Sequence, residues 1–363
     1  MEKKHATRLP SLDGWRAISI ALVLGAHSRR TADFPQWLSP IFKWFDGFLG
    51  VRFFFIISGF LITWLMICEK KQTGTVNLGH FYARRALRIL PVYLAFLCTL
   101  GVIQYVTPFS QSTAGWVGNF TFTTNFVPGT RPMNHLWSLS VEQQFYLIWP
   151  GIFVLCGIAA NTRKALLILV VPILLAPVCR VMTYKQFYPA FLSPLFSYFS
   201  FFNYFDSLAI GCACAVLWDY KRPLIQHQLN VRTWAAVVLA LALIVVPYGF
   251  DYAHLLGRVA VFFGNSFQSF GFAILLLHSF SSPNKGFYRA LNWPWVQWIG
   301  VLSYSIYIWQ QVFCSPPEMF GLKPVWWMSF PGWLITVLIV ASISYYGFER
   351  PLLKLRAYFR DAR

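Results

Sequence analysis

Residues 44–67 read WFDGFLGVRFFFIISGFLITWLMI, a nearly unbroken apolar run. A helix of about 20 apolar residues is enough to cross the hydrocarbon core of a bilayer. Similar runs recur along the 363 residues, of which 57% are hydrophobic and 19% aromatic. Only 12% are charged, whereas about a quarter of the residues of a soluble domain are, and the mean hydropathy is +0.53. The sequence therefore predicts an integral membrane protein.

The apolar runs predict an all-α fold, a polytopic bundle of about ten transmembrane helices. No internal repeat, low-complexity tract or long linker divides the chain, so we expect one integral membrane domain over residues 1–363. The first run leads into further spans with no small-residue cleavage site after it, which argues against a cleaved signal peptide. The spans are expected near residues 11–28, 44–67, 89–106, 138–159, 164–182, 195–217, 232–249, 257–280, 296–314 and 327–347.

The net charge of +18 comes from basic residues in short clusters between the apolar runs. With the N-terminus in the cytoplasm, roughly 20 Lys and Arg fall on the inner side and about 8 on the outer side, as the positive-inside rule expects. Both termini are therefore predicted to be cytoplasmic, and the partner of the clusters to be membrane lipid, not nucleic acid. The seven cysteines show no Cys-x-x-Cys spacing, so neither a metal site nor a permanently bound cofactor is predicted.

The first predicted helix carries Asp13, Arg16 and His27 on one face. Arg16 and His27 are eleven residues apart, which is about three helical turns and roughly 16 Å. Ionisable groups inside a membrane are costly and are functional candidates by default. We favour a functional role for His27, while Asp13 and Arg16 either take part in the site or form a simple ion pair at the interface.

The stretch HFYARRALRILPVYL, residues 80–94, is basic and amphipathic. Arg85 and Arg88 share a helix face, and Arg84 is adjacent. Two interpretations remain open. The stretch is a membrane-surface helix whose cations contact lipid headgroups, or it is a phosphate clamp, because guanidinium groups bind phosphate bidentately.

The string NHLWSLSVEQQFYLIWP, residues 134–150, is the most informative in the chain. Ser140 and Gln143 have the spacing of a capping box, which favours a helix start at Ser140. A carboxylate just inside a span needs a partner, and His27 lies at a comparable predicted depth. We therefore predict that Glu142 pairs with His27 and holds the imidazole as a general base.

Three other features stay open at this stage. Residues 107–137 form the longest outer loop, which either lines a site or is a plain surface loop. Arg52 either extends to the interface or holds an anion. Asp206 has no partner nearby in the sequence and, like Glu349, is expected either to act in the site or to neutralise a neighbouring Arg.

Several strings in this order resemble the acyltransferase family 3 of membrane proteins, from residue 12 to about residue 351. The strings are LDGWRAISIALVLGAH, GVRFFFIISGFLIT, FYARRALRIL, HLWSLSVEQQFYLIWP, FDSLAIGC, WIGVLSYSIYIW and FERP. The resemblance implies an acyl-CoA-dependent O-acyltransferase, usually an acetyltransferase, of the bacterial inner membrane. Its acceptors are cell-envelope polysaccharides or lipid-linked oligosaccharides, and other envelope glycan assembly proteins are expected partners.

The family's functional residues fall on matching positions of this sequence. The Arg and His of its first helix correspond to Arg16 and His27, its Arg-x-x-Arg pair to Arg85 and Arg88, and its conserved-string acid to Glu142.

The chain also departs from the family pattern. Members commonly have Asp where this chain has Arg52 and His where it has Gln310, and the Arg often found just before the position of Asp206 is missing. No esterase-like domain follows the membrane part of this sequence. We therefore expect one chain to receive and transfer the acyl group, or to hand it to another chain.

Together these features predict a mechanism. Acyl-CoA, with acetyl-CoA as the family's usual donor, enters from the cytoplasm and its phosphates are held by the arginines of residues 84–88 with help from Arg16. His27, oriented by Glu142, then removes the proton from a sugar hydroxyl as the hydroxyl attacks the thioester. Acceptor or oxyanion contacts are expected from the following residues: Asp13, His135, Trp137 and Ser140.

Two other function classes share some of these sequence features. A glycan or lipid transporter or flippase also has charges inside the membrane, but no inverted repeat supports it. A non-catalytic partner of a glycan assembly complex would bind no acyl-CoA. Release of CoA distinguishes the enzyme from both.

Overall fold

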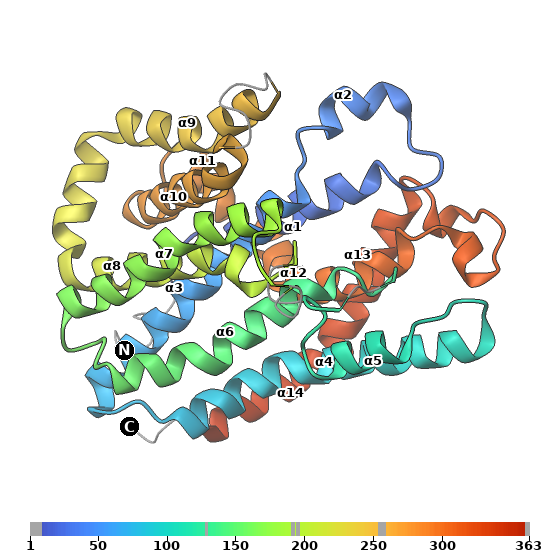
Figure 1. Cartoon of the computed structure of the whole chain (residues 1–363), viewed down its shortest axis with the longest axis horizontal. Coiled ribbons are helices and arrows are strands. Elements are labelled where there is room, and N and C mark those ends of the chain that lie inside the picture. The colour runs from blue at the N-terminus through green and yellow to red at the C-terminus, as the bar shows by residue number, and fades with distance from the viewer. Residues whose placement is uncertain (1–8, 128–129, 190–192, 194–196, 253–258, 360–363) are drawn as a thin grey trace.

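The structure is a computed structural model that describes residues 9–127, 130–189, 193, 197–252 and 259–359. These residues fold into helices and turns and contain no β-strand, so the predicted all-α class is confirmed (Figure 1). The long helices are α1 (Leu12–Ser28), α3 (Gly47–Thr73), α4 (Leu78–Val106), α6 (Leu136–Leu155), α7 (Thr162–Lys185), α8 (Phe205–Val231), α9 (Thr233–Tyr252), α10 (Val259–Ser281), α12 (Pro294–Phe313) and α13 (Gly332–Ile343).

Short elements connect the long helices. The short α-helices are α2 (Ser39–Phe42), α5 (Thr113–Phe120), α11 (Gly286–Leu291) and α14 (Arg350–Lys354). The 3₁₀ turns are η2 (Gln36–Leu38), η4 (Phe201–Asn203), η5 (Pro317–Phe320), η6 (Trp326–Met328) and η8 (Leu355–Phe359), and η7 (Ser344–Glu349) is a π-helical turn.

Every predicted span overlaps one long helix, although the spans predicted at 195–217 and 257–280 begin outside the described residues. Among the described residues, four helical segments are by themselves long and apolar enough to cross a membrane, and a fifth is added if α8 and α9, bent by 91°, form one span. The four segments are Gln36–Thr73, Leu78–Val106, Thr162–Lys185 and Gly332–Phe359. These helices are those of a membrane protein, whereas ten crossings and cytoplasmic termini stay predictions.

Local sequence signals set the helix ends. Asp46 caps α3 by accepting from the backbone N–H of Phe48 at 2.8 Å, and the helix ends at Gly74, whose φ of 77° favours glycine. Asn77 caps α4 in the same way, accepting from His80 N–H at 3.0 Å. The helix start predicted at Ser140 is wrong. Helix α6 begins at Leu136, and Ser140 Oγ donates within the helix to the Leu136 carbonyl at 3.2 Å.

Glycines let the central helices approach closely. A Cβ on Gly59 of α3 would lie 2.1 Å from the Leu208 carbonyl oxygen of α8, and one on Gly211 would lie 2.2 Å from that of Ile56. A Cβ on Gly300 of α12 would lie 1.8 Å from the Asp13 carbonyl oxygen of α1. Helix α3 is therefore held against α8, and α1 against α12. This second contact fixes the register of the two helices that carry His27 and Gln310.

Asp206 has a partner that the sequence did not reveal. It is fully buried, and Arg180 of α7 donates to its carboxylate at 2.6 Å. Arg180 also donates to the carbonyls of Asn203 and Phe262, each at 2.9 Å, and to Ser266 Oγ at 3.0 Å. The pair is therefore neutralised and almost fully hydrogen-bonded, which is the condition under which buried charges are tolerated.

Arg52 is likewise held inside the protein. Its guanidinium donates to Gln268 of α10 at 2.6 Å and lies 3.7 Å from the Asp46 carboxylate, while only 4% of the residue is exposed. Neither interpretation left open for Arg52, extension to the interface or binding of an anion, agrees with this geometry. It joins α3 to α10 instead.

Candidate active site

A cavity lies among α1, α3, α4, α6 and α12 and contains most of the charged candidates. It encloses about 720 Å³ of space outside the atoms, a figure that includes open solvent. Much of the wall is apolar, from residues such as Phe54, Phe55 and Leu139. Its polar lining comes from the following residues: Arg16, Ser58, Arg85, Arg88, Ser138, Glu142, Tyr146, Ser303, Tyr304 and Tyr307.

Three arginines gather in this cavity, Arg16 from α1 and Arg85 and Arg88 from α4. The Arg85 guanidinium stacks on the Tyr146 ring at 3.9 Å, and its buried Nε has no hydrogen-bond partner within the described chain. Three guanidinium groups face one lining carboxylate, Glu142, which leaves an excess of positive charge. Cationic donors with unmet hydrogen bonds in a concave site suit an anionic ligand such as a phosphate.

The structure places Glu142 beside these arginines and away from His27. Its Oε1 accepts short hydrogen bonds from Ser58 of α3 and from Tyr146, one turn further along α6. The predicted pair of Glu142 with His27 is therefore not formed. Glu142 instead belongs to the cationic part of the cavity, where its charge also acts on Arg16.

Two other residues predicted for the site, Arg84 and Asp13, form ion pairs with other residues of the protein. Arg84 donates to Glu69 and to the Phe359 carbonyl, each at 2.7 Å, and is not among the described residues that line the cavity. Asp13 lies 3.6 Å from Arg16, the simple i,i+3 pair that was one of its two interpretations. The phosphate role of Arg84 and the substrate role of Asp13 stay predictions.

His27 lies in the last turn of α1 and is oriented by α12. Its Nδ1 is 2.9 Å from Gln310 Oε1, and Gln310 is fully buried. An amide oxygen only accepts hydrogen bonds, so with this oxygen facing the ring Nδ1 carries the proton. The lone pair then lies on Nε2, and His27 has a free basic nitrogen.

His135 connects the cavity with the neighbourhood of His27. Ser138 and Tyr307, which line the cavity, donate to the His135 carbonyl at 3.1 and 3.0 Å. The His135 ring is buried, with Nε2 3.1 Å from the Ile308 carbonyl, and is close enough to His27 for the two to interact electrostatically. Ser138 and Tyr307 thus join the cavity wall to the His135 backbone, whereas neither His27 nor His135 is among the described residues that line the cavity.

Two residues predicted to contact the acceptor lie elsewhere. Trp137 packs with ring centroids 4.7 Å from Phe199 and 4.8 Å from Tyr204, and the Ser140 hydroxyl is fully buried within α6. Neither is among the described residues that line the cavity. Their substrate role therefore stays a prediction without support from the geometry.

A family model described as an acyltransferase domain matches residues 9–348. The chain belongs to acyltransferase family 3. The O-acetyltransferase OatA of Staphylococcus aureus is 27% identical, over 98% of this chain and 59% of that protein. The peptidoglycan O-acetyltransferase OatA of Listeria monocytogenes is 25% identical, over 95% of this chain and 56% of that protein. The chain thus spans just over half the length of these relatives. No solved structure matches it.

Two of the lining residues, Ser138 and Tyr307, were not candidates from the sequence. Ser138 and Tyr146 flank Glu142 at intervals of four residues, and all three line the cavity. That spacing places them on one helix face, which the sequence could have revealed. Tyr307 and the contact of Gln310 with His27 depend on the register of α1 against α12, for which no local signal exists.

Proposed function

We propose that the chain transfers an acyl group, most simply acetyl, from acyl-CoA to a hydroxyl of a cell-envelope polysaccharide. Peptidoglycan is the acceptor that the name of the Listeria relative gives, and we extend it to this chain as the first acceptor to test. The proposed location is the bacterial inner membrane, with the acceptor on its outer side.

The observation that carries the proposal is the arrangement along α1. Arg16 lies in the cavity with two further arginines, and His27 is eleven residues away, roughly 16 Å along the helix. A ligand that meets both must be long and narrow, with a strongly anionic end and a reactive group at the other end. Acyl-CoA has this shape, with phosphates at one end and the thioester at the other.

In the proposed reaction Arg85, Arg88 and Arg16 hold the phosphates, and the acyl arm extends past Ser138 toward His27. The acceptor hydroxyl oxygen attacks the thioester carbonyl carbon while its proton passes to His27 Nε2. The carbon–sulfur bond then breaks, the acyl group stays on the acceptor oxygen as an ester, and the CoA thiolate takes up the proton. Gln310 accepts from Nδ1–H throughout, which keeps the ring oriented and stabilises the imidazolium.

CoA release tests the proposal. Purified wild-type protein is compared with His27→Ala, in the presence and absence of peptidoglycan fragments, and ester formation on the glycan is measured in parallel. We expect acceptor-dependent CoA release from the wild type and a loss of at least about 100-fold in His27→Ala, the usual contribution of a general base. His227→Ala, at an exposed position of α8, is the matched control and should retain activity.

Full activity in a folded His27→Ala variant would remove this residue from the chemistry. If the wild type released no CoA in the presence of a competent acceptor extract, a transport function would replace the proposal.

A further inference from the structure

A second group of arginines lies at the opposite end of α1 from the cavity. Residues 107–137 contain a single Lys, Arg, Asp or Glu residue, which is Arg131. Arg30 lies two residues beyond the end of α1 and three residues after His27. Neither residue was a candidate from the sequence, and neither takes part in the donor site described above.

Each arginine lies close to a histidine in the chain, Arg30 three residues after His27 and Arg131 four residues before His135. The backbone N–H of Arg30 donates to the His27 carbonyl at 3.0 Å. Arg131 lies in a turn just before α6, where Met133 N–H donates to the Thr130 carbonyl at 2.9 Å. His27 Nδ1 lies 2.9 Å from Gln310 Oε1 and His135 Nε2 lies 3.1 Å from the Ile308 carbonyl, so α12 brings both histidines, and the arginines near them in the chain, to one end of the bundle.

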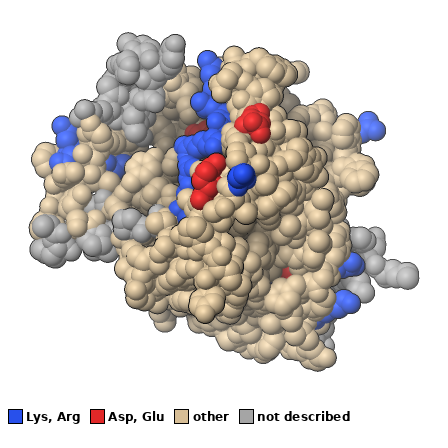
Figure 2. All heavy atoms as spheres, turned by 90° about the vertical axis from the view of Figure 1, so that its right-hand side faces the viewer, with Lys and Arg blue, Asp and Glu red and all other residues tan. Residues whose placement is uncertain are grey.

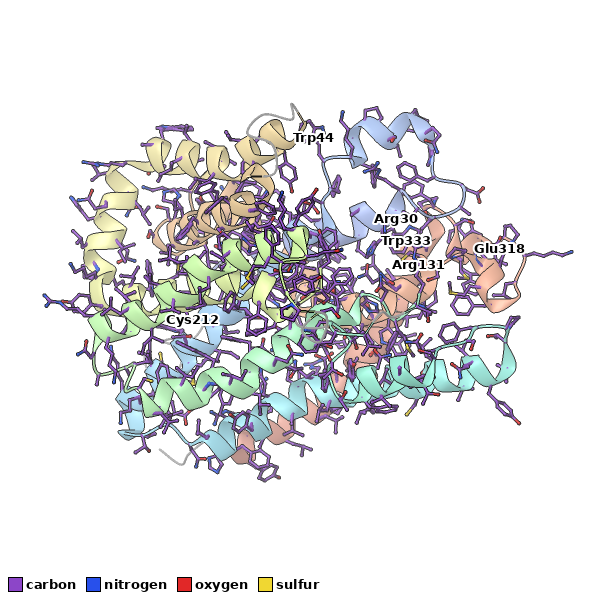
Figure 3. All side chains as sticks on the ribbon, in the orientation of Figure 1. Arg30, Trp44, Arg131, Cys212, Glu318 and Trp333 are labelled. Carbon is purple, nitrogen blue, oxygen red and sulfur yellow. The ribbon has the colours of Figure 1, made fainter. Side chains whose placement is uncertain are left out.

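Within the described chain neither guanidinium group forms an ion pair. Arg30 is exposed and Arg131 half-buried, and no carboxylate of the described chain pairs with either within 4.0 Å. Figure 2 shows basic side chains gathered near the middle of this end of the molecule, with acidic side chains beside them. Figure 3 shows Arg30 and Arg131 toward that same end.

This placement is unfavourable for the proposed chemistry unless an anion is bound. His27 becomes an imidazolium as it takes the acceptor proton, and two positive charges beside it oppose that change. An anion held between the guanidinium groups would neutralise them and remove the opposition. The site would then be fully active only when an anionic acceptor occupies it.

We infer that Arg30 and Arg131 form an anion-binding subsite for the acceptor, and that the acceptor carries a carboxylate or phosphate group near the hydroxyl that is acylated. The inference rests on the proposed function and deepens it by giving the chemical class of the acceptor. Guanidinium groups bind both anions bidentately, so one subsite fits a sugar carboxylate or the diphosphate of a lipid-linked glycan.

Binding without a donor tests the subsite separately from catalysis. The full chain is placed in phosphatidylcholine nanodiscs and titrated calorimetrically with a tetrasaccharide of alternating N-acetylglucosamine and N-acetylmuramic acid, with neutral chitotetraose and with inorganic pyrophosphate. The variants are Arg30→Gln, Arg131→Gln and the double variant. Arg29→Gln is the matched control, because Arg29 is an exposed neighbour in the same turn.

We expect the wild type to bind one anionic probe on the order of tenfold or more tightly than chitotetraose, as a charge-assisted contact of about 1.4 kcal/mol or more would give. Preference for the tetrasaccharide indicates a sugar carboxylate, and preference for pyrophosphate indicates a diphosphate. Each single variant should lose most of the preference, the double variant all of it, and Arg29→Gln none.

The inference is overturned if the wild type prefers neither anion, if the double variant keeps the preference, or if Arg29→Gln loses it equally. Because no acyl-CoA is present, a failure of the acyl-transfer proposal would leave these binding results unchanged. Thermal unfolding of each variant verifies that lost binding does not come from lost folding.

Discussion

Replacing Gln310 by Leu should slow acyl transfer without weakening donor binding. The His27 Nδ1–H···Oε1 bond at 2.9 Å joins two neutral groups at rest but becomes charge-assisted when His27 takes a proton. A hydrogen bond to a charged group contributes about 1.5–3 kcal/mol, and each 1.36 kcal/mol is a tenfold change in rate, so kcat should fall roughly 10- to 150-fold. KM for acyl-CoA should stay within about twofold, because Arg16, one of the arginines proposed to hold the phosphates, lies some 16 Å from His27 along α1.

The assay is CoA release at saturating acceptor over a range of acyl-CoA concentrations. Gln310→His, which restores the residue common in the family, should recover most of the lost kcat. Gln311→Leu is the matched control, because it removes a neighbouring buried amide, whereas the hydrogen bond to His27 comes from Gln310. A folded Gln310→Leu variant with kcat within twofold of the wild type, or with the change confined to KM, would refute the role of Gln310 in orienting His27.

Two further predictions concern the charged residues. Arg85→Gln and Arg88→Gln should each raise KM for acyl-CoA on the order of tenfold in steady-state assays. Arg84→Gln should change KM less than about twofold, because Arg84 does not line the cavity. Equal effects of all three variants would contradict the assignment of the cavity as the donor site. Asp206→Asn should lower the free energy of unfolding by about 3–5 kcal/mol in thermal or denaturant unfolding, because it leaves the buried Arg180 without a counter-charge. The double variant Asp206→Leu with Arg180→Met should recover most of this loss.

The positions of the helices could be predicted from the sequence because burial in lipid leaves long apolar runs. The helix ends are harder to predict where a helix continues beyond its apolar run into polar residues. The structure joins residues 80–94 to the span predicted at 89–106 in one helix, α4. Hydropathy falls in this first part because Arg85 and Arg88 face a cavity, not because the helix ends. A local average cannot separate these two causes.

Contacts between side chains on different helices could not be predicted from the sequence. Arg180 and Asp206 are 26 residues apart on different helices, and nothing in either segment identifies the other as its partner. The same holds for His27 and Gln310, which are 283 residues apart. Their contact depends on Gly300, whose missing side chain lets α12 approach α1. Intramembrane charge identifies candidates one by one, and packing alone decides which of them meet.

The depth of Glu142 explains why its predicted pairing failed. With the helix start placed at Ser140, Glu142 would lie two residues inside the span and level with His27 at the end of α1. Helix α6 instead begins at Leu136, so Glu142 lies six residues inside it, roughly 9 Å from its start. His27 is one residue from the end of α1. At this depth the Glu142 carboxylate contacts Ser58 and Tyr146 and lies beside the arginines. The proposed base, His27, is therefore hydrogen-bonded to the neutral amide of Gln310 and not to a carboxylate. The four-residue shift in one helix start thus moves the acid from the proposed acceptor side to the proposed donor side.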